Sequence, residues 1–180
     1  MDKTPGNNDI YFLIVENLAT PTFAIDTNHK IIVWNRACEK LTGALAQEMI
    51  GTDNQWVPFY QNKRPTVSDL VIDRKAQDMS KYYSNFSLNK SIVEEGWEAE
   101  GWYDNLGGKR RYIFFTALPV KDAQGNIIAA VETLEDITTR IEEQEEAKKV
   151  NSMMVGRELK MVELKQEVER LQKIVDTKAS

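Results

Sequence analysis

The residues that most often perform catalysis are scarce in this chain. His29 is the only histidine and Cys38 the only cysteine, so a nucleophile paired with an imidazole would have to use His29. His29 lies in residues 26–30, a turn-rich spacer between two β-prone runs, where we expect a solvent-exposed side chain. Cys38 shares a predicted helix face with Leu41, which indicates a core position. We therefore expect no enzymatic activity and no metal site in this chain.

Three glutamates in predicted strands are the remaining chemical candidates. Glu98 and Glu100 alternate with apolar residues, a pattern typical of a wet strand face. If Glu132 points into an apolar interior, it needs a hydrogen-bond partner, a counter-charge or a raised pKa. A basic or amide-bearing ligand or an ordered water would satisfy it. Pairing with a nearby Arg or Lys, or a register shift of one residue into solvent, would also explain Glu132, and the sequence leaves these alternatives open.

Bulk properties limit the class of protein. The 180 residues fit one domain plus an extension, and 42% hydrophobic with 28% charged residues is a globular composition. A net charge of −5 argues against nucleic-acid binding. No apolar run approaches the roughly 20 residues that span a bilayer, so we expect no membrane insertion. The start of the chain does not read as a secretory signal, and a single cysteine suits a reducing compartment, so we expect a cytoplasmic protein.

The spacing of apolar residues predicts an α+β fold. Residues 1–8 should be disordered, and residues 9–20 should form a flanking helix ended by Pro21. A hairpin should follow at residues 23–25 and 31–34. Short helices should then form at residues 35–43, 45–50, 65–71 and 79–83. A three-strand meander should come last, at residues 97–102, 110–120 and 127–134. These segments give five antiparallel strands, with helices inserted between the second and the third.

A long helix should follow the last strand. Almost no helix breaker occurs in residues 139–180, and Thr139 with Glu142 has the form of a capping box. Seven apolar residues and one arginine lie at alternating three- and four-residue steps, typical of a coiled-coil seam: Val150, Met154, Arg157, Met161, Leu164, Val168, Leu171 and Val175. Such a helix is marginal alone in water, so we expect a homodimer. A helix folded back on the domain is the alternative.

Four local sequences resemble the PAS domain family, and the predicted strands and helices follow one another in the order of the PAS fold. They are residues 31–43, 48–51, 119–126 and 136–138, the last being the Asp-Ile-Thr signature that closes many PAS domains before a signalling helix. The resemblance covers residues 10–138. It implies a PAS fold over residues 21–138, followed by a coiled-coil signalling helix over residues 139–180.

The same resemblance implies a regulatory module rather than an enzyme. A curved sheet in this family often encloses a small molecule, and changes of state pass through a signalling junction, here Asp136, Ile137 and Thr138, to a coiled coil. An effector such as the histidine kinase of a two-component system would then respond. The residues expected to line the cavity are Phe23, Ile25, Trp56, Tyr60, Ile113, Phe115, Ala117, Ala130, Glu132 and Leu134.

The sequence also narrows the cofactors. Haem needs an axial ligand, and His29 in a turn is a poor one, which argues against haem. Light-sensing relatives form a flavin adduct on a cysteine, but the comparable residues 51–56 contain none, which excludes covalent flavin photochemistry. A non-covalently bound flavin or a small metabolite stays open.

Two functions remain for this chain. We expect small-ligand sensing and dimerisation coupled to an effector through the coiled coil. The alternative is a ligand-free interaction scaffold. Residues 139–180 contain no histidine that could accept a phosphate, so we expect the effector to be a partner kinase or a further domain of a longer protein.

Overall fold

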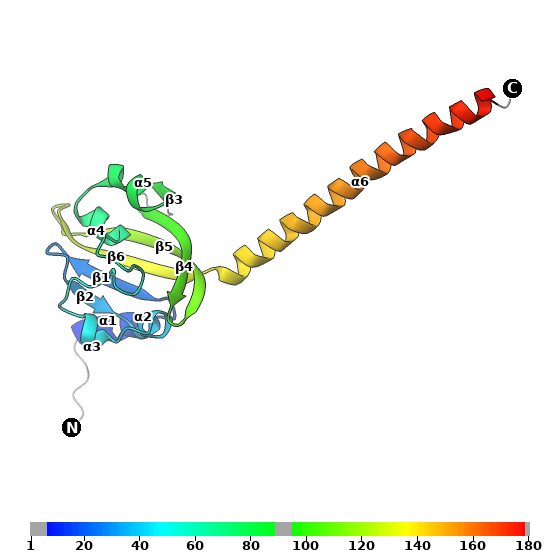
Figure 1. Ribbon diagram of the computed structural model, residues 1–180. Coiled ribbons are helices and arrows are strands. Elements are labelled where there is room, and N and C mark those ends of the chain that lie inside the picture. Colours follow the sequence, from blue (N-terminus) through cyan, green and yellow to red (C-terminus); the bar gives the residue numbers. More distant parts are fainter. Residues whose placement is uncertain (1–6, 89–94, 179–180) are drawn as a thin grey trace. The chain divides into compact units, whose positions relative to one another are not determined.

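The computed structural model describes residues 7–88 and 95–178. The chain divides after Thr138 into two units, a domain and a helix, which are described separately. The domain contains a six-stranded antiparallel sheet in the order β2-β1-β6-β5-β4-β3 (Figure 1). The strands are β1 (Thr22–Asp26), β2 (Ile31–Trp34), β3 (Asn85–Leu88), β4 (Trp97–Leu106), β5 (Lys109–Lys121) and β6 (Ile127–Asp136).

The predicted hairpin and the predicted meander both form. β1 pairs with β2, and β4, β5 and β6 follow one another as antiparallel neighbours. Asp26 closes the first hairpin, because its Oδ1 accepts hydrogen bonds from the backbone N–H groups of Asn28 and Lys30, both at 2.8 Å. Between them His29 has a φ of 61°, in the left-handed region that a histidine adopts only at some strain. β6 pairs with β1 and so joins the hairpin and the meander in one sheet.

The prediction of five strands was wrong by one. β3 adds a sixth strand, which pairs with residues 97–100 of β4. It has only four residues, all of them exposed or half-buried. Backbone pairing with β4, rather than burial of an apolar face, therefore defines this strand, and a search for apolar periodicity overlooks it.

Short helices precede the meander, at α2 (Arg36–Thr42), α3 (Ala46–Met49), α4 (Val67–Ile72), η1 (Ala76–Asp78) and α5 (Met79–Tyr82). α2 begins where predicted, because the Asn35 side chain accepts a hydrogen bond from the N–H of Cys38 at 2.9 Å. It ends at Gly43, whose φ is 79°. α4 packs on β5 and β6. It buries Val67, Leu70 and Val71.

The flanking helix is displaced from its predicted range. α1 (Asn7–Glu16) ends four residues before residue 20. The Asn17 side chain donates to the carbonyl of Leu13 at 2.7 Å, and Asn35 donates to the carbonyl of Val15 at 3.2 Å. Other donors thus satisfy the last carbonyls, so the helix stops there. Its large apolar side chains are exposed: Ile10, Tyr11, Phe12, Leu13 and Ile14.

The second unit is one helix, α6 (Thr138–Lys178), of 41 residues. It begins one residue before the predicted capping box, because the Asp136 carboxylate accepts a hydrogen bond from the N–H of Thr138 at 3.1 Å. The described apolar side chains of the predicted seam are exposed, namely Val150, Met154, Met161, Leu164 and Val168. The side chains of Leu171 and Val175 lie outside the described residues. Within the described ranges, no helix is long and apolar enough to cross a bilayer.

Candidate functional site

Most of the predicted cavity residues form the packed core of the domain. Eight of them are at most 2% exposed: Phe23, Ile25, Ile113, Phe115, Ala117, Ala130, Glu132 and Leu134. The strand face predicted to point inward does so. Only Trp56 and Tyr60 of the predicted set line the pockets described below, and they line different ones. Ligand binding by the complete set remains a prediction.

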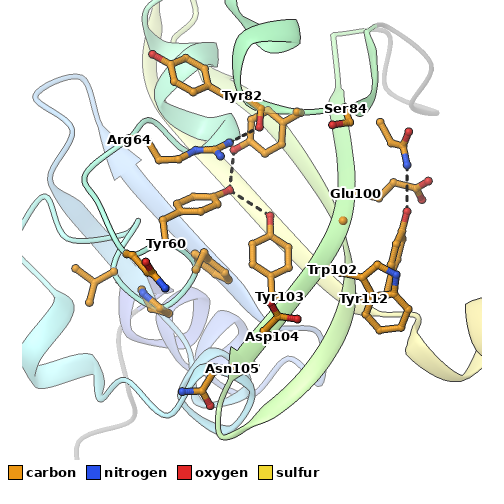
Figure 2. A pocket seen from close by; sticks show the side chains of 17 residues that line it. Tyr60, Arg64, Tyr82, Ser84, Glu100, Trp102, Tyr103, Asp104, Asn105 and Tyr112 are labelled. Atoms are coloured by element: carbon orange, nitrogen blue, oxygen red, sulfur yellow. Dashed lines mark hydrogen bonds between the residues drawn. The ribbon is translucent and has the colours of Figure 1, made fainter.

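A pocket of about 700 Å³ lies beside this core and is called here the tyrosine pocket. Its walls come from residues 57–61 and Arg64, from the end of α5 with the residues after it, from β4, and from Tyr112 on β5. The Tyr60 hydroxyl lies 3.3 Å from that of Tyr83 and 3.2 Å from that of Tyr103 (Figure 2). Burial raises the pKa of all three phenols, which are therefore neutral hydroxyl groups at physiological pH.

Among the described residues, Arg64 is the one basic side chain in the wall of this pocket. Its guanidinium carbon lies 4.0 Å from the ring centre of Tyr60 and 4.9 Å from that of Tyr83. One terminal nitrogen donates to the carbonyl of Tyr82 at 2.6 Å, and Figure 2 shows the guanidinium among these groups. Cation–π contacts and this hydrogen bond hold the charge in place without a carboxylate partner in the described chain. A rigid guanidinium beside neutral phenols can bind an anionic or acceptor-rich group.

The open side of the pocket follows the edge of β4. In the described chain, β3 pairs with β4 only over residues 97–100. The pocket is lined by the next five residues, 101–105. Of these, Gly101, Trp102 and Tyr103 pair with β5, and the register is irregular between Tyr103 and Leu106. Gly101 leaves open space at this edge, because a Cβ there would have no atom within 4 Å apart from its chain neighbours. Part of the wall is therefore backbone that can still form hydrogen bonds.

Glu132 points inward and is 1% exposed. Its Oε2 accepts a hydrogen bond from the backbone N–H of Ser68, in the first turn of α4, at 2.7 Å. Burial raises its pKa to about 7, the Ser68 hydrogen bonds oppose this, and the nearby charge of Asp69 adds to it. Of the alternatives that the sequence left open, solvent exposure and a salt bridge with Arg or Lys are not seen in the described chain. The partner of Glu132 is a backbone amide of α4.

Asp69 joins four groups at the beginning of α4. Its Oδ2 accepts hydrogen bonds from the N–H and the hydroxyl of Thr66, both at 2.8 Å, and its Oδ1 accepts one from Gln55 at 2.7 Å. His29 Nδ1 lies 2.6 Å from the same Oδ1, while its Nε2 lies 3.2 Å from a carboxylate oxygen of Asp73. The prediction of a solvent-exposed His29 was therefore wrong, since its side chain is 33% exposed and held by two carboxylates. These carboxylates lie 40 and 44 residues further along the chain than His29, so no local sequence pattern could indicate the contacts.

The predicted signalling junction lies next to the tyrosine pocket through β5. The Tyr112 ring lines the pocket. The Tyr112 backbone N–H donates to the Thr138 hydroxyl at 2.8 Å, and its carbonyl accepts from the N–H of Ile137 at 3.0 Å. Arg111 forms an ion pair with Asp136. Burial alone would raise the pKa of Asp136, but hydrogen bonds from Thr138 and Arg111 lower it below its ordinary value.

Comparison with known proteins identifies the class. A family model described as a PAS domain matches residues 20–139, more than half of the chain. The chain therefore belongs to the PAS domain family. No curated protein matches the sequence.

Solved structures share the fold at low sequence identity. One is an RNA-binding light-oxygen-voltage receptor, 14% identical, with a TM-score of 0.56; the match covers 84% of this chain and 41% of the receptor. Another is the PAS domain of BvgS from Bordetella pertussis, 14% identical, with a TM-score of 0.45; the match covers 82% of this chain and 99% of that domain. A third is the PAS domain of the RpfR quorum-sensing receptor from Cronobacter turicensis in complex with C12:0, 19% identical, with a TM-score of 0.41. The match covers 68% of this chain and 97% of that domain. This chain spans less than half the length of the first receptor.

Proposed function

We propose that this chain is the sensory module of a bacterial-type signal-transduction protein and that its tyrosine pocket binds a small metabolite or a non-covalent flavin. The observation that carries the proposal is the pocket wall of Arg64 and three neutral tyrosines. Such a wall offers aromatic faces and hydrogen-bond donors, which favour a planar ligand with an anionic or acceptor-rich end. The volume of about 700 Å³ is that of a small-molecule site.

The pocket and the signalling junction share neighbouring residues of the sheet. Tyr103 of the pocket lies opposite Arg111 on β5, and Arg111 holds Asp136. The Tyr103 ring also lies 5.4 Å from that of Phe115, which pairs with Leu134 on β6. A ligand that moves Tyr103 would thus act on the last strand through direct contacts. In this proposal, occupancy of the pocket changes how firmly Asp136 and Thr138 hold the beginning of α6.

The output of the module is proposed to be a homodimeric coiled coil. Five described apolar residues of the predicted seam are exposed on α6, which favours a partner helix. A second copy of the chain supplies an identical seam. The effector would be a domain or partner such as the histidine kinase of a two-component system, and any catalytic activity would belong to it. A ligand-free dimerisation scaffold is the second candidate, favoured by the packing of the inner strand face.

Native mass spectrometry of the purified full chain tests the two candidates together. The sensing proposal expects a dimer that carries a reproducible bound mass. Arg64→Gln should remove this mass because it deletes the charge, and Tyr103→Phe should weaken its retention because it deletes one hydroxyl. Tyr11→Phe, which changes an exposed ring on α1, is the matched control. Thermal melting checks that each variant folds. A dimer without bound mass, also after incubation with cell metabolites and flavins, would favour the scaffold.

A further inference from the structure

We propose that His29, Asp69 and Asp73 form a proton-dependent latch, in which the doubly protonated histidine ring ties the β1–β2 turn to α4. His29 Nδ1 lies 2.6 Å from Asp69 Oδ1, and His29 Nε2 lies 3.2 Å from Asp73 Oδ1. The latch gives the domain a second input, the proton, which acts on the sheet through the first turn of α4. None of the three residues lines the tyrosine pocket, so the latch does not depend on a ligand there.

The histidine ring faces one carboxylate with each of its nitrogens. Asp69 and Asp73 are four residues apart, so both carboxylates lie on one face of α4 and its end. An ionised carboxylate only accepts hydrogen bonds, and a neutral imidazole has one N–H group and one bare nitrogen. A neutral ring could therefore donate to one of the two residues and would present a lone pair to the other. Both contacts form together only when both nitrogens carry a hydrogen.

Both carboxylates already accept hydrogen bonds from other groups. Asp69 Oδ2 accepts two hydrogen bonds from Thr66, and Asp69 Oδ1 accepts one from Gln55. Asp73 Oδ2 accepts one from Lys75 at 2.8 Å. Burial alone would raise the pKa of Asp73, but Lys75 and the histidine lower it below its ordinary value. The proton that the latch can lose therefore lies on the ring, because histidine is the side chain that ordinarily titrates near neutral pH.

The other charged groups around the ring keep their charge near neutral pH. A hydrogen bond from the backbone N–H of Lys30 lowers the pKa of Asp26, and the Lys63 ammonium lowers that of Asp53 to about 2. The ring lies in the wall of a second pocket of about 410 Å³, which Trp56 also lines together with three charged residues, Asp53, Lys63 and Arg64. Lysine and arginine stay protonated in this range. The ring is 33% exposed, so protons from solvent reach it.

The backbone of the turn holds the ring in position. His29 has a φ of 61°, a conformation that a histidine adopts only at some strain. Asp26 closes the turn, because its side chain and its carbonyl accept hydrogen bonds from the N–H groups of Asn28, His29 and Lys30. A strained residue persists where its surroundings hold it. The two carboxylates at α4 supply such contacts from outside the turn.

The latch reaches the inner face of the sheet through two neighbouring residues of α4. Asp69 forms the capping box of this helix with Thr66. Ser68, the residue before Asp69, donates its N–H to Glu132 Oε2 at 2.7 Å. Glu132 belongs to β6, the strand that ends at Asp136 of the signalling junction. Loss of the proton from the histidine removes one of the two contacts, which loosens the first turn of α4 and its hydrogen bond to β6.

NMR of the full chain without an affinity tag tests the two contacts of the ring. His29 is the only histidine, so its ring signals need no further assignment. At about pH 6 both ring N–H protons should be visible, because hydrogen bonds to the carboxylates slow their exchange with water. Asp73→Ala should remove the Nε2–H signal and keep the Nδ1–H signal. Asp78→Ala, which removes a carboxylate that pairs with Lys81, is the matched control and should keep both.

Hydrogen exchange of the α4 amides tests the link to the sheet. His29→Asn removes the ring, and asparagine tolerates the positive φ of this position. At about pH 6 the N–H groups of Thr66 and Ser68 should exchange about tenfold faster in this variant than in the wild type, the loss expected for one hydrogen bond. At about pH 8.5 the two proteins should exchange at the same rate, because the latch is open in both. Both proteins contain Glu132, so its own titration cancels in the comparison.

Three results would contradict the latch. The first is a single visible ring N–H proton at about pH 6. The second is an equal effect of His29→Asn at both pH values, which would make the ring a structural contact without proton dependence. The third is no effect at either pH, which would mean that α4 does not respond to the ring. These tests use no ligand, so a failed latch leaves the proposed sensory function untouched, and an empty tyrosine pocket leaves the latch untouched.

Discussion

The two units of the chain differ in how far they bury residues of the same type. Leu134 in the domain is 1% exposed, whereas Leu164 in α6 is 54% exposed. Met79 is fully buried, whereas Met161 is 70% exposed. The sheet and the helices packed on it bury an apolar core, whereas the described apolar seam residues of α6 are exposed, as are the apolar residues of α1. The difference indicates that the domain folds by its own contacts, while the sequence of α6 is suited to a partner.

The largest effect should come from a substitution that the packing of the domain forbids. Gly107 has a φ of 58°, and a Cβ there would lie 2.3 Å from the carbonyl oxygen of Leu41. Gly107→Ala should therefore lower the free energy of unfolding by about 3 kcal/mol or more, measured by urea denaturation. Gly125 has a φ of 85° with open space around its Cβ position. Gly125→Ala is the control and should lower the free energy of unfolding by only about 1 kcal/mol. Equal losses would mean that the contact with Leu41 relaxes freely.

The next effect concerns Glu132, a titratable side chain buried in the inner face of the sheet. The pKa of Glu132 is raised from 4.5 to about 7 by burial. The folded chain therefore binds more protons than the unfolded chain between these values, and stability falls as pH rises through them. The loss amounts to about 3 kcal/mol above pH 7, at 1.36 kcal/mol per pKa unit.

Glu132→Gln should remove this part of the pH dependence, because an amide does not ionise. Urea denaturation at about pH 4 and about pH 8 measures it, since these values lie below 4.5 and above about 7, the pKa of Glu132 in the unfolded and in the folded chain. The variant and the wild type should be similar in stability at the lower pH, and the variant should be more stable at the higher pH. Other carboxylates are unchanged in the variant, so the difference between the two proteins isolates Glu132. Parallel pH profiles would mean that Glu132 titrates at its ordinary pKa.

A smaller effect is expected from the polar residue in the predicted seam of α6. Arg157 occupies a seam position, where a charged side chain costs dimer stability. Arg157→Leu should tighten the dimer about tenfold, because it extends the apolar seam by one buried side chain. Sedimentation equilibrium measures the dissociation constant. Arg170, which pairs with Glu167 outside the seam, supplies the control Arg170→Leu, which should leave the constant unchanged. Equal effects of both variants would contradict the predicted seam.

The sequence predicted what depends on neighbours along the chain. Asn35 and Gly43 bound α2 as expected, and the resemblance to the PAS family placed one face of β5 and β6 inward, while the sequence left the orientation of Glu132 open. It did not predict what depends on residues far apart. The contacts of His29 lie 40 and 44 residues away, and the pairing of β3 depends on β4 rather than on its own four residues. Eight of the predicted cavity residues are buried in the core, and ligand binding by the predicted set remains a prediction.

The smallest predicted effect also comes from a glycine-to-alanine substitution, but this substitution should raise stability, whereas Gly107→Ala should lower it. Gly156 lies within α6, and a Cβ there would meet no atom within 4 Å. Gly156→Ala should therefore stabilise α6 by about 1 kcal/mol, because glycine loses the most backbone entropy in a helix. Circular dichroism during thermal melting measures the gain, and Ala147→Gly, in the same helix, should produce a loss of similar size. A loss of stability in Gly156→Ala would be the more informative result. It would place a partner chain so close to residue 156 that no side chain fits, and would thus locate the dimer contact on α6.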